Sequence, residues 1–293
     1  MAVTAVVLAG GESVRFGSDK LEFAIEKEPM LGRVVRVVRE VADRVVISVR
    51  DPGSVARLTA IVGRSVAFLP DLPQLGGLGP GAGIVTAVDR CGADELLVVP
   101  GDMPWLTSTA LRSFCQKAKA LGATVGIPQW PDGEIEPVVQ WQAAGAWAGR
   151  IGSLARGGAG VRPTDLVRGG DAAVLLPVTA LSADRRCFAS VNVRPDTELP
   201  SADWSDRDRA SEPLALGPEA RDAFWAAVRS TARGALVEAT ASYRREAGRY
   251  ARLGVPRLEA HALGDALRCA REASIPAFRL EKRLEELRGP RGI

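Results

Sequence analysis

The sequence predicts an α/β fold, a mostly parallel twisted sheet with helices on both faces, followed by an all-α C-terminal extension. In the first part of the chain, short runs that are apolar at every position alternate with segments of helical periodicity. Continuous apolar runs are typical of parallel strands buried on both faces. Alternating strands and helices favour right-handed crossovers that cover both sides of one sheet. The last part of the chain has helical periodicity only, which predicts the extension.

The first strand is expected at residues 3–9, where a Val-rich run ends in two glycines. Leu and Val then recur at helical spacing over 30–41, and 44–49 is again rich in Val and Ile, as in a buried strand, so a strand–loop–helix–strand unit opens the fold. A Ser at the start of the third expected helix, Ser108, is its predicted cap. The further expected elements are strands at 66–69, 96–100, 123–127, 137–141 and 191–193 and helices at 82–88 and 107–121.

The polar segment 197–211 is rich in Asp, Ser and Pro, which is typical of a linker. We therefore predict two domains, residues 1–205 with the sheet and residues 213–293 with helices. An apolar and aromatic stripe between Trp225 and Tyr250 predicts core packing rather than a ligand site. The expected helices of the extension are 218–250, as one or two segments, then 256–273 and 276–287, the last two each opened by a Pro suited to a first turn.

Composition argues against several classes of function. A formal net charge of +3 is too small to indicate a nucleic-acid partner. No apolar stretch approaches the length of a membrane span, and the apolar run at the N-terminus is too short for a secretory signal. Scattered cysteines and a single histidine, His261, indicate neither a disulfide framework nor a zinc site. We expect a cytoplasmic protein that binds neither membrane nor nucleic acid.

The most informative stretch is residues 8–20, LAGGESVRFGSDK. Its glycines let the backbone approach a polyphosphate and direct N–H donors toward it, while Arg15 and Lys20 supply fixed positive charge. A tight turn between a strand and a helix would also favour glycines, but it would not need both cations. The spacing differs from that of a P-loop and from the G-x-G-x-x-G of dinucleotide-binding proteins. The stretch therefore predicts a site for a nucleoside triphosphate.

Asp102 follows the expected strand 96–100 in the sequence PGDMPWL. A carboxylate at the carboxyl end of a central strand faces the crevice in which open α/β sheets bind ligands. Hard oxygen ligands of this kind suit Mg²⁺ that is shared with phosphates. An Asp that only begins a turn before Pro104 would give the same local pattern. Beside the glycine-rich stretch, we assign Asp102 as the metal ligand.

The 8–20 stretch resembles the N-terminal signature of GT-A type nucleotidyltransferases, whose fold is Rossmann-like. In its form LAGGxSxR(M/F)GxDK it resembles the molybdenum cofactor guanylyltransferases, the MobA family. The segment around Asp102 is similar to the family's Asp-Met-Pro-Phe-Leu, with Trp105 in the aromatic position. The resemblance ends before the helical extension, which has no counterpart in the family pattern.

Three further segments resemble the family with departures. Asp71 and the loop 76–84 are similar to an acidic residue followed by Gly-Pro-Leu-x-Gly-Ile, a loop that closes over the nucleotide, but Gly81 stands where a larger apolar residue is usual. Residues 190–199 are similar to Asn-Val-Asn-Thr-Pro-Glu-Asp-Leu, with Asn192 at the matching position and Arg194 in place of the second Asn. Glu136 replaces a frequent His before Pro, so acceptor contacts there are expected to differ.

The resemblance implies a Mg²⁺-dependent enzyme that transfers GMP from GTP to the phosphate of molybdopterin and releases pyrophosphate, with Lys20, Arg15 and Asp102 as catalytic residues. Three alternatives stay open, namely a relative that uses CTP, another phosphorylated acceptor, and a non-catalytic nucleotide-binding protein. The helical extension is expected to dock a partner or to self-associate. The residues assigned to nucleotide and cofactor binding are Leu8, Ala9, Gly10, Gly11, Lys20, Ser48, Asp71, Gly79, Asp102 and Asn192.

Overall fold

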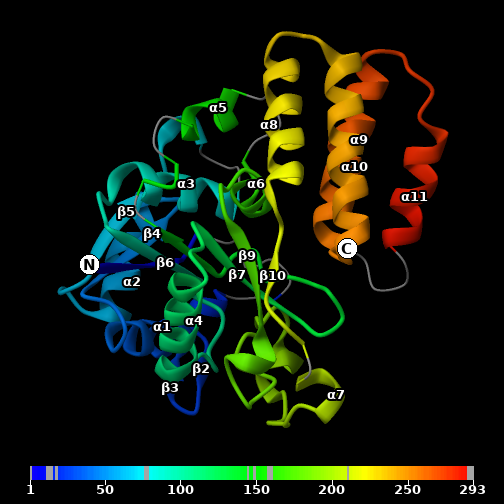
Figure 1. The fold of residues 1–293 in the computed structure, drawn as a ribbon. Helices are drawn as coiled ribbons and strands as arrows, with labels where there is room; N and C mark the ends of the chain where they lie inside the picture. The colour runs from blue at the N-terminus through cyan, green and yellow to red at the C-terminus, as the bar shows by residue number, and fades with distance from the viewer. Residues whose placement is uncertain are drawn as a thin grey trace.

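The computed structural model describes residues 2–10, 16, 19–75, 79–143, 145–147, 150–156, 161–209 and 211–288. Within these residues one mixed sheet forms the centre of the fold, with strands in the order β10-β9-β7-β8-β6-β1-β4-β5 (Figure 1). The strands are β1 Val3–Leu8, β4 Arg44–Val49, β5 Ala67–Pro70, β6 Glu95–Pro100, β7 Val125–Gln129, β8 Gln140–Ala143, β9 Ala173–Pro177 and β10 Leu214–Ala215. A separate two-stranded ribbon pairs β2 Ala24–Ile25 with β3 Glu28–Pro29.

The central strand β1 is parallel to both of its neighbours, β4 and β6, and β5 extends this parallel half of the sheet. Strand β8 runs antiparallel to both β6 and β7, β9 is again parallel to β7, and β10 closes the other edge in antiparallel orientation. The predicted mostly parallel α/β sheet is thus confirmed.

Successive residues of β1 enter opposite hydrophobic cores, as the two-residue period of a strand requires. Ala5 and Val7 pack with α1, α2 and α4 on one face, whereas Val6 packs with α3 and α6 on the other. Helices therefore cover both faces of the sheet. The helices of the sheet region are α1 Met30–Arg39, α2 Val55–Val62, α3 Pro80–Arg90, α4 Ser108–Ala120, α5 Ile151–Arg156, α6 Pro163–Arg168 and α7 Asp206–Arg209.

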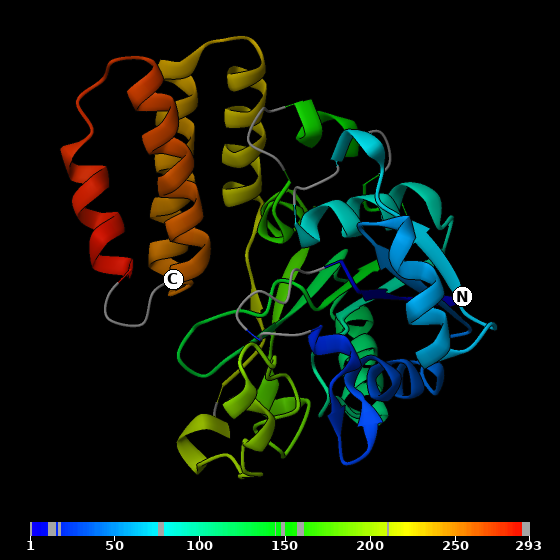
Figure 2. The same cartoon turned by 180° about the vertical axis from the view of Figure 1, so that it is seen from behind.

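The helical extension packs beside the sheet rather than apart from it (Figures 1 and 2). Its buried Phe224, Tyr243 and Tyr250 share one hydrophobic core with Val125 of the sheet and Leu166 of α6. The predicted core role of the aromatic stripe is confirmed, although Ala232 at its middle is exposed. The division into residues 1–205 and 213–293 stays a prediction. The helices of the extension are α8 Pro218–Ala232, α9 Leu236–Leu253, α10 Pro256–Glu272 and α11 Phe278–Arg288.

Three sequence predictions about local structure are wrong. No strand forms at 191–193, because Val191 makes only one backbone bond, from its N–H to the Asp102 carbonyl at 2.9 Å. Thr107 rather than Ser108 caps α4, its Oγ1 accepting from the Ala110 N–H at 3.2 Å. The strand expected at 137–141 begins only at Gln140, because the residues before it form a turn.

The segment 197–211 is not an open linker. Trp204 is buried, and its indole N–H donates to the Ser182 carbonyl at 2.7 Å. Arg185 lies over the Trp204 ring at 5.3 Å, and Asp203 forms an isolated bridge with Asp184. Trp204 therefore holds the segment against the sheet region, which the polar composition of the segment did not indicate.

None of the helices in the described part of the chain has both the length and the apolar character needed to cross a lipid bilayer.

Candidate functional site

The loops that follow four parallel strands meet at the carboxyl edge of the sheet. Leu8, the last residue of β1, lies beside Ser48 of β4 and Pro100 of β6 in the register. The Gly101 N–H donates to the Leu8 carbonyl at 2.9 Å, which ties the loop after β6 to the end of β1. This edge is where open α/β sheets bind ligands.

A cavity of about 440 Å³ lies at this edge. It contains eight of the residues assigned from the sequence, although they come from six separate segments of the chain. Ala9 does not line the cavity, but its N–H donates to the Ser48 carbonyl at 2.8 Å. Gly11 and Arg15 lie outside the described residues. The lining residues are Leu8, Gly10, Lys20, Leu21, Ser48, Arg50, Asp71, Gly79, Pro80, Gly83, Pro100, Asp102, Val138, Ser190 and Asn192.

Lys20 and Asp102 form an ion pair in the cavity. Lys20 begins a short 3-10 helix, Lys20–Glu22, whose N-cap is Asp19, and its ammonium also donates to the Val191 carbonyl at 3.4 Å. Each side chain of the pair is 15% exposed, so solvent screens their attraction only in part.

The second carboxylate oxygen of Asp102, Oδ1, is buried and has no hydrogen-bond partner among the described residues. A buried acceptor without a partner is costly, and in native proteins it often marks a site for an ion or a water molecule. Asp102 therefore presents one oxygen to Lys20 and keeps the other for a cation or a hydrogen-bond donor.

Asp71 lies on the opposite wall, directly after β5. The Ser48 hydroxyl donates to its Oδ1 at 3.3 Å. Burial raises the pKa of Asp71 above its ordinary value, while the Ser48 hydrogen bond and the positive charge of Arg50 oppose that rise. Helix α3 lies this close to Ser48 only because residue 83 is a glycine, since a Cβ there would lie 2.5 Å from the Ser48 Oγ.

Helix α3 begins at the cavity. Gly79, its N-cap, has φ of +70°, a left-handed conformation that favours glycine, and Pro80 occupies the first helical position. The first turn of the helix carries N–H groups without intrahelical partners and the positive end of the helix dipole, both of which favour an anion. Gly81 departs from the family pattern for a visible reason, because a Cβ there would lie 1.7 Å from the Val161 carbonyl oxygen.

Asn192 lines the cavity on the Asp102 side, in the loop between residues 189 and 194. Its backbone N–H donates to Asp196 Oδ2 at 2.7 Å, as does the N–H of Val193 at 2.9 Å. Arg194, which replaces an Asn of the family pattern, lies over the rings of Phe16 and Phe23 at 5.6 and 5.5 Å. This loop is therefore fastened to the segment that carries Lys20.

Sequence reasoning did not assign seven of the lining residues, namely Leu21, Arg50, Pro80, Gly83, Pro100, Val138 and Ser190. Arg50 had a usable signal, because it follows directly on a predicted central strand just as Asp102 nearly does. Val138 had none, since nothing local shows that the loop after β7 returns to the cavity.

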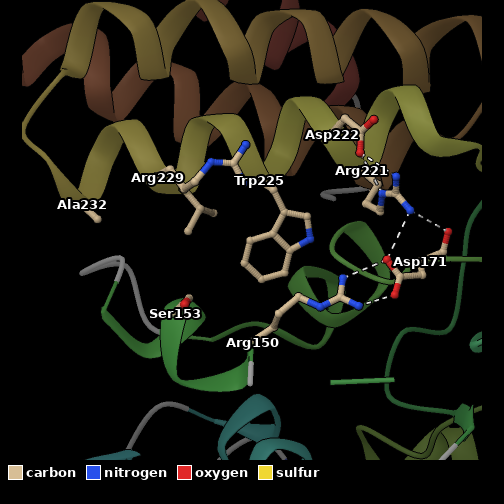
Figure 3. Close-up of a pocket in the computed structure, with 9 residues that line it drawn as sticks. Arg150, Ser153, Asp171, Arg221, Asp222, Trp225, Arg229 and Ala232 are labelled. Atoms are coloured by element: carbon tan, nitrogen blue, oxygen red, sulfur yellow. Dashed lines mark hydrogen bonds and ion pairs between the residues drawn. The ribbon is translucent and has the colours of Figure 1, made fainter. Parts of the chain in front are cut away.

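A second cavity, of about 560 Å³, lies between α5 and α8 (Figure 3). It is larger than the first, but both carboxylates that line it, Asp171 and Asp222, are already paired with arginine side chains. Asp171 accepts from Arg150 at 2.8 Å and from Arg221 at 3.2 Å, so both guanidinium groups contact the same carboxylate. None of the residues assigned from the sequence lines it. The candidate site is therefore the smaller cavity, which holds Lys20 and Asp102.

The comparisons with known proteins identify the family of the chain. A family model described as the MobA-like NTP transferase domain matches residues 5–168. A probable molybdenum cofactor guanylyltransferase from Synechococcus elongatus is 31% identical over 121 residues, which make up 41% of this chain and 61% of that protein. The molybdenum cofactor guanylyltransferase of Rhodobacter capsulatus is 29% identical over 129 residues, 43% of this chain and 64% of that one.

The chain thus spans about three fifths of the length of these curated relatives. Among solved structures, the molybdopterin-guanine dinucleotide biosynthesis protein A of Archaeoglobus fulgidus superposes with a TM-score of 0.55 at 21% identity, covering 67% of this chain and 95% of that one. This likeness concerns the fold. Because the family model covers more than half of the chain, including Leu8, Ser48 and Asp102, the chain belongs to the family of MobA-like NTP transferase domains.

Proposed function

We propose that this protein is a Mg²⁺-dependent guanylyltransferase that transfers GMP from GTP to the terminal phosphate of molybdopterin and releases pyrophosphate. One observation carries the proposal, namely the Lys20–Asp102 pair in a cavity at the carboxyl edge of the sheet, where Asp102 keeps one buried oxygen without a partner among the described residues. The curated relatives are named molybdenum cofactor guanylyltransferases, which supports the choice of GTP and molybdopterin.

The residues of the cavity fit a magnesium ion. Mg²⁺ in nucleotide-using enzymes is held by one or two carboxylates, with substrate phosphates and water completing its octahedron. No group of three or more His, Cys, Asp or Glu in the described part of the chain could hold a metal by itself, so substrate oxygens would have to complete the site. Held by Asp102, the ion would neutralise phosphate charge.

The side chains of the cavity bind and orient the substrates. Lys20 and, by its place in the motif, Arg15 offset the negative charge that builds up on the departing pyrophosphate. Gly10 and the first turn of α3 let the backbone approach the phosphates closely. Asp71, positioned by Ser48, accepts hydrogen bonds from the base or the ribose.

No protein side chain needs to act as a covalent nucleophile. The acceptor phosphate is already an anion, and one of its oxygens attacks the α-phosphorus in line while the bond from that phosphorus to the bridging oxygen of pyrophosphate breaks. The contribution of the protein is to hold both phosphates in this alignment and to exclude competing water.

The test is to incubate the protein with Mg²⁺, each of the four α-labelled NTPs in turn, and molybdopterin. We expect pyrophosphate release and label transfer to molybdopterin with GTP at least tenfold above the other three. Equal release with CTP would overturn the choice of base, and no release with any NTP would overturn catalysis. Docking of a partner or self-association through α8–α11 stays a prediction, which the oligomeric state of a chain ending at Ser211 would test.

A further inference from the structure

The helical extension reaches one loop of the candidate site directly. Residues 130–139 connect β7 to β8 as a long hairpin loop that lies beneath the turn between α9 and α10 (Figures 1 and 2). Arg257, in the first turn of α10, donates through Nε to Glu134 Oε2 of this loop at 2.9 Å. The guanidinium is 35% exposed and the carboxylate 23%, so the pair is partly shielded and stronger than a fully exposed one.

The backbones of the two segments also meet. Gly133 at the tip of the loop has φ of +86°, and a Cβ built there would lie 2.6 Å from the Gly254 carbonyl oxygen at the end of α9. The tip itself is a tight turn, in which the Gly133 N–H donates to the Trp130 carbonyl at 3.0 Å. Glycine at this position allows the contact with the extension, because the Cβ of any other residue would push the two backbones apart.

The return limb of the loop continues into the cavity. The Glu136 N–H donates to the Pro128 carbonyl at 3.0 Å, and Val138 then lines the cavity on the side of Asp102 and Asn192. Gln140 holds the end of this limb, because its side-chain amide donates to the Pro137 carbonyl at 2.7 Å. The loop is therefore fixed at both ends and at its tip, and its tip is fixed by the extension.

Carboxylates lie near the return limb of the loop, and their negative charge favours a cation beside them. Burial raises the pKa of Glu136 to about 7; the positive charge of Arg257 opposes this rise, and the carboxylate of Asp102 adds to it. Glu136 thus lies within electrostatic range of both Arg257 and Asp102. An anionic acceptor that approaches from this side meets carboxylates at Glu134, Glu136 and Asp102, whose charge Arg257 partly offsets.

We propose that Arg257 of the helical extension is a positioning residue for the transfer reaction. It holds the 130–139 loop in place as the wall of the cavity that faces the acceptor, and it offsets the negative charge of the carboxylates there. The proposal rests on the proposed function, and it concerns the acceptor because the nucleotide residues Ser48, Asp71 and Gly79 lie on the opposite wall. In this view the extension is part of the active-site architecture of the intact chain.

The test compares the full-length Arg257→Ala, Arg257→Lys and Gly133→Ala variants by steady-state kinetics with GTP and molybdopterin. We expect Arg257→Ala to raise KM for molybdopterin roughly tenfold, with KM for GTP changed by less than about twofold. Arg257→Lys retains the charge and should recover most of the loss, while Gly133→Ala displaces the tip without changing any charge and should raise the same KM. The matched control is Arg271→Ala, which removes an exposed 2.9 Å ion pair with Glu281 at the opposite end of α10 from Arg257.

Hydrogen exchange of residues 130–139 provides a second readout that needs no turnover. We expect faster exchange there in Arg257→Ala and Gly133→Ala but not in Arg271→Ala. An Arg257→Ala enzyme with an unchanged KM for molybdopterin, or with equal rises in both KM values, would overturn the inference while wild-type activity upholds the proposed function. Absence of activity in the wild type would instead overturn the proposed function. If hydrogen exchange of residues 130–139 were also unchanged in the Arg257→Ala and Gly133→Ala variants, the docking of the loop on the extension would be overturned as well.

Discussion

Lys20 and Asp102 are 82 residues apart in the sequence and form a direct ion pair at the carboxyl edge of the sheet. Each residue follows a different parallel strand, β1 and β6, and these strands are neighbours. The parallel register therefore turns two separate sequence motifs into one cation–carboxylate pair. A triphosphate that enters the cavity would compete with Asp102 for the ammonium of Lys20, which would free the carboxylate to bind a divalent ion.

Gly81 and Gly264 are both helical glycines, and we predict opposite effects when each is replaced by Ala. A Cβ at position 81 would lie 1.7 Å from the backbone oxygen of Val161, whereas nothing lies within 4 Å of a Cβ at position 264. Gly81→Ala should lower the free energy of unfolding by about 1–3 kcal/mol. Gly264→Ala should raise it by about 0.5–1 kcal/mol, since Ala is the better helix former. Urea denaturation measures both, and a Gly81→Ala protein as stable as wild type would show that α6 does not press on α3.

The buried guanidinium of Arg168 joins α6 to the helical extension. Its Nε and Nη2 donate to the two carboxylate oxygens of Glu246 at 2.7 and 2.8 Å, and its Nη1 donates to Asp265 at 2.8 Å. Arg168→Met would leave the buried carboxylate of Glu246 without its cation, while Asp265 would keep its pair with Arg162, and the free energy of unfolding should fall by about 3–5 kcal/mol. Arg271→Ala, which breaks an exposed pair with Glu281, should cost less than about 1 kcal/mol. Equal losses of unfolding free energy in the two variants would show that the buried network contributes no more to stability than an exposed ion pair does.

His261 is the only histidine of the chain, so its NMR signal can be assigned without ambiguity. Burial, together with the positive charges of Arg162 and Arg168, lowers its pKa from 6.5 to about 4, against the opposing effect of the Asp165 and Asp265 carboxylates. Its Nδ1 lies 2.6 Å from the Thr164 hydroxyl, at the contact between α10 and α6.

Because the pKa of His261 is lowered in the folded state, this side chain takes up a proton near pH 6.5 in the unfolded chain but only near pH 4 in the native protein. The stability contribution of this histidine is present above pH 6.5 and is lost as the pH falls from 6.5 to 4, by at most about 3 kcal/mol. His261→Gln should flatten that part of the pH–stability curve. An NMR titration midpoint near 6.5 would mean that His261 is solvated and that α10 is not packed on α6 as described.

The sequence was most informative where one physical signal dominated. The strands β1, β4 and β6 are predominantly apolar because both of their faces are covered, and this pattern predicted them almost to the residue. The site residues at their carboxyl ends, such as Ser48 and Asp102, follow from the same register. Gly79 and Asp71 were placed by motif alone, and the structure brings them into the same cavity.

What the sequence could not reveal depends on tertiary contacts. Strand β9 has an apolar run like that of β1 and could have been recognised, but Arg168 looks like any exposed arginine until α9 and α10 surround it. Trp204 sits in a polar segment whose composition masks its burial. The contact of Arg257 with Glu134 joins residues 123 positions apart and leaves no local signal at either one.

The most direct test of the central claim is the transfer rate of Lys20→Ala and Asp102→Asn with GTP, Mg²⁺ and molybdopterin. The matched control is Lys119→Ala, because Lys119 pairs with Glu95 at 2.6 Å at the other end of β6, outside the cavity. With circular dichroism showing all three variants folded, we predict that each site variant loses at least about 10²-fold in kcat/KM. The control should stay within about twofold of wild type. A folded Lys20→Ala or Asp102→Asn protein that turns over at the wild-type rate would contradict the account.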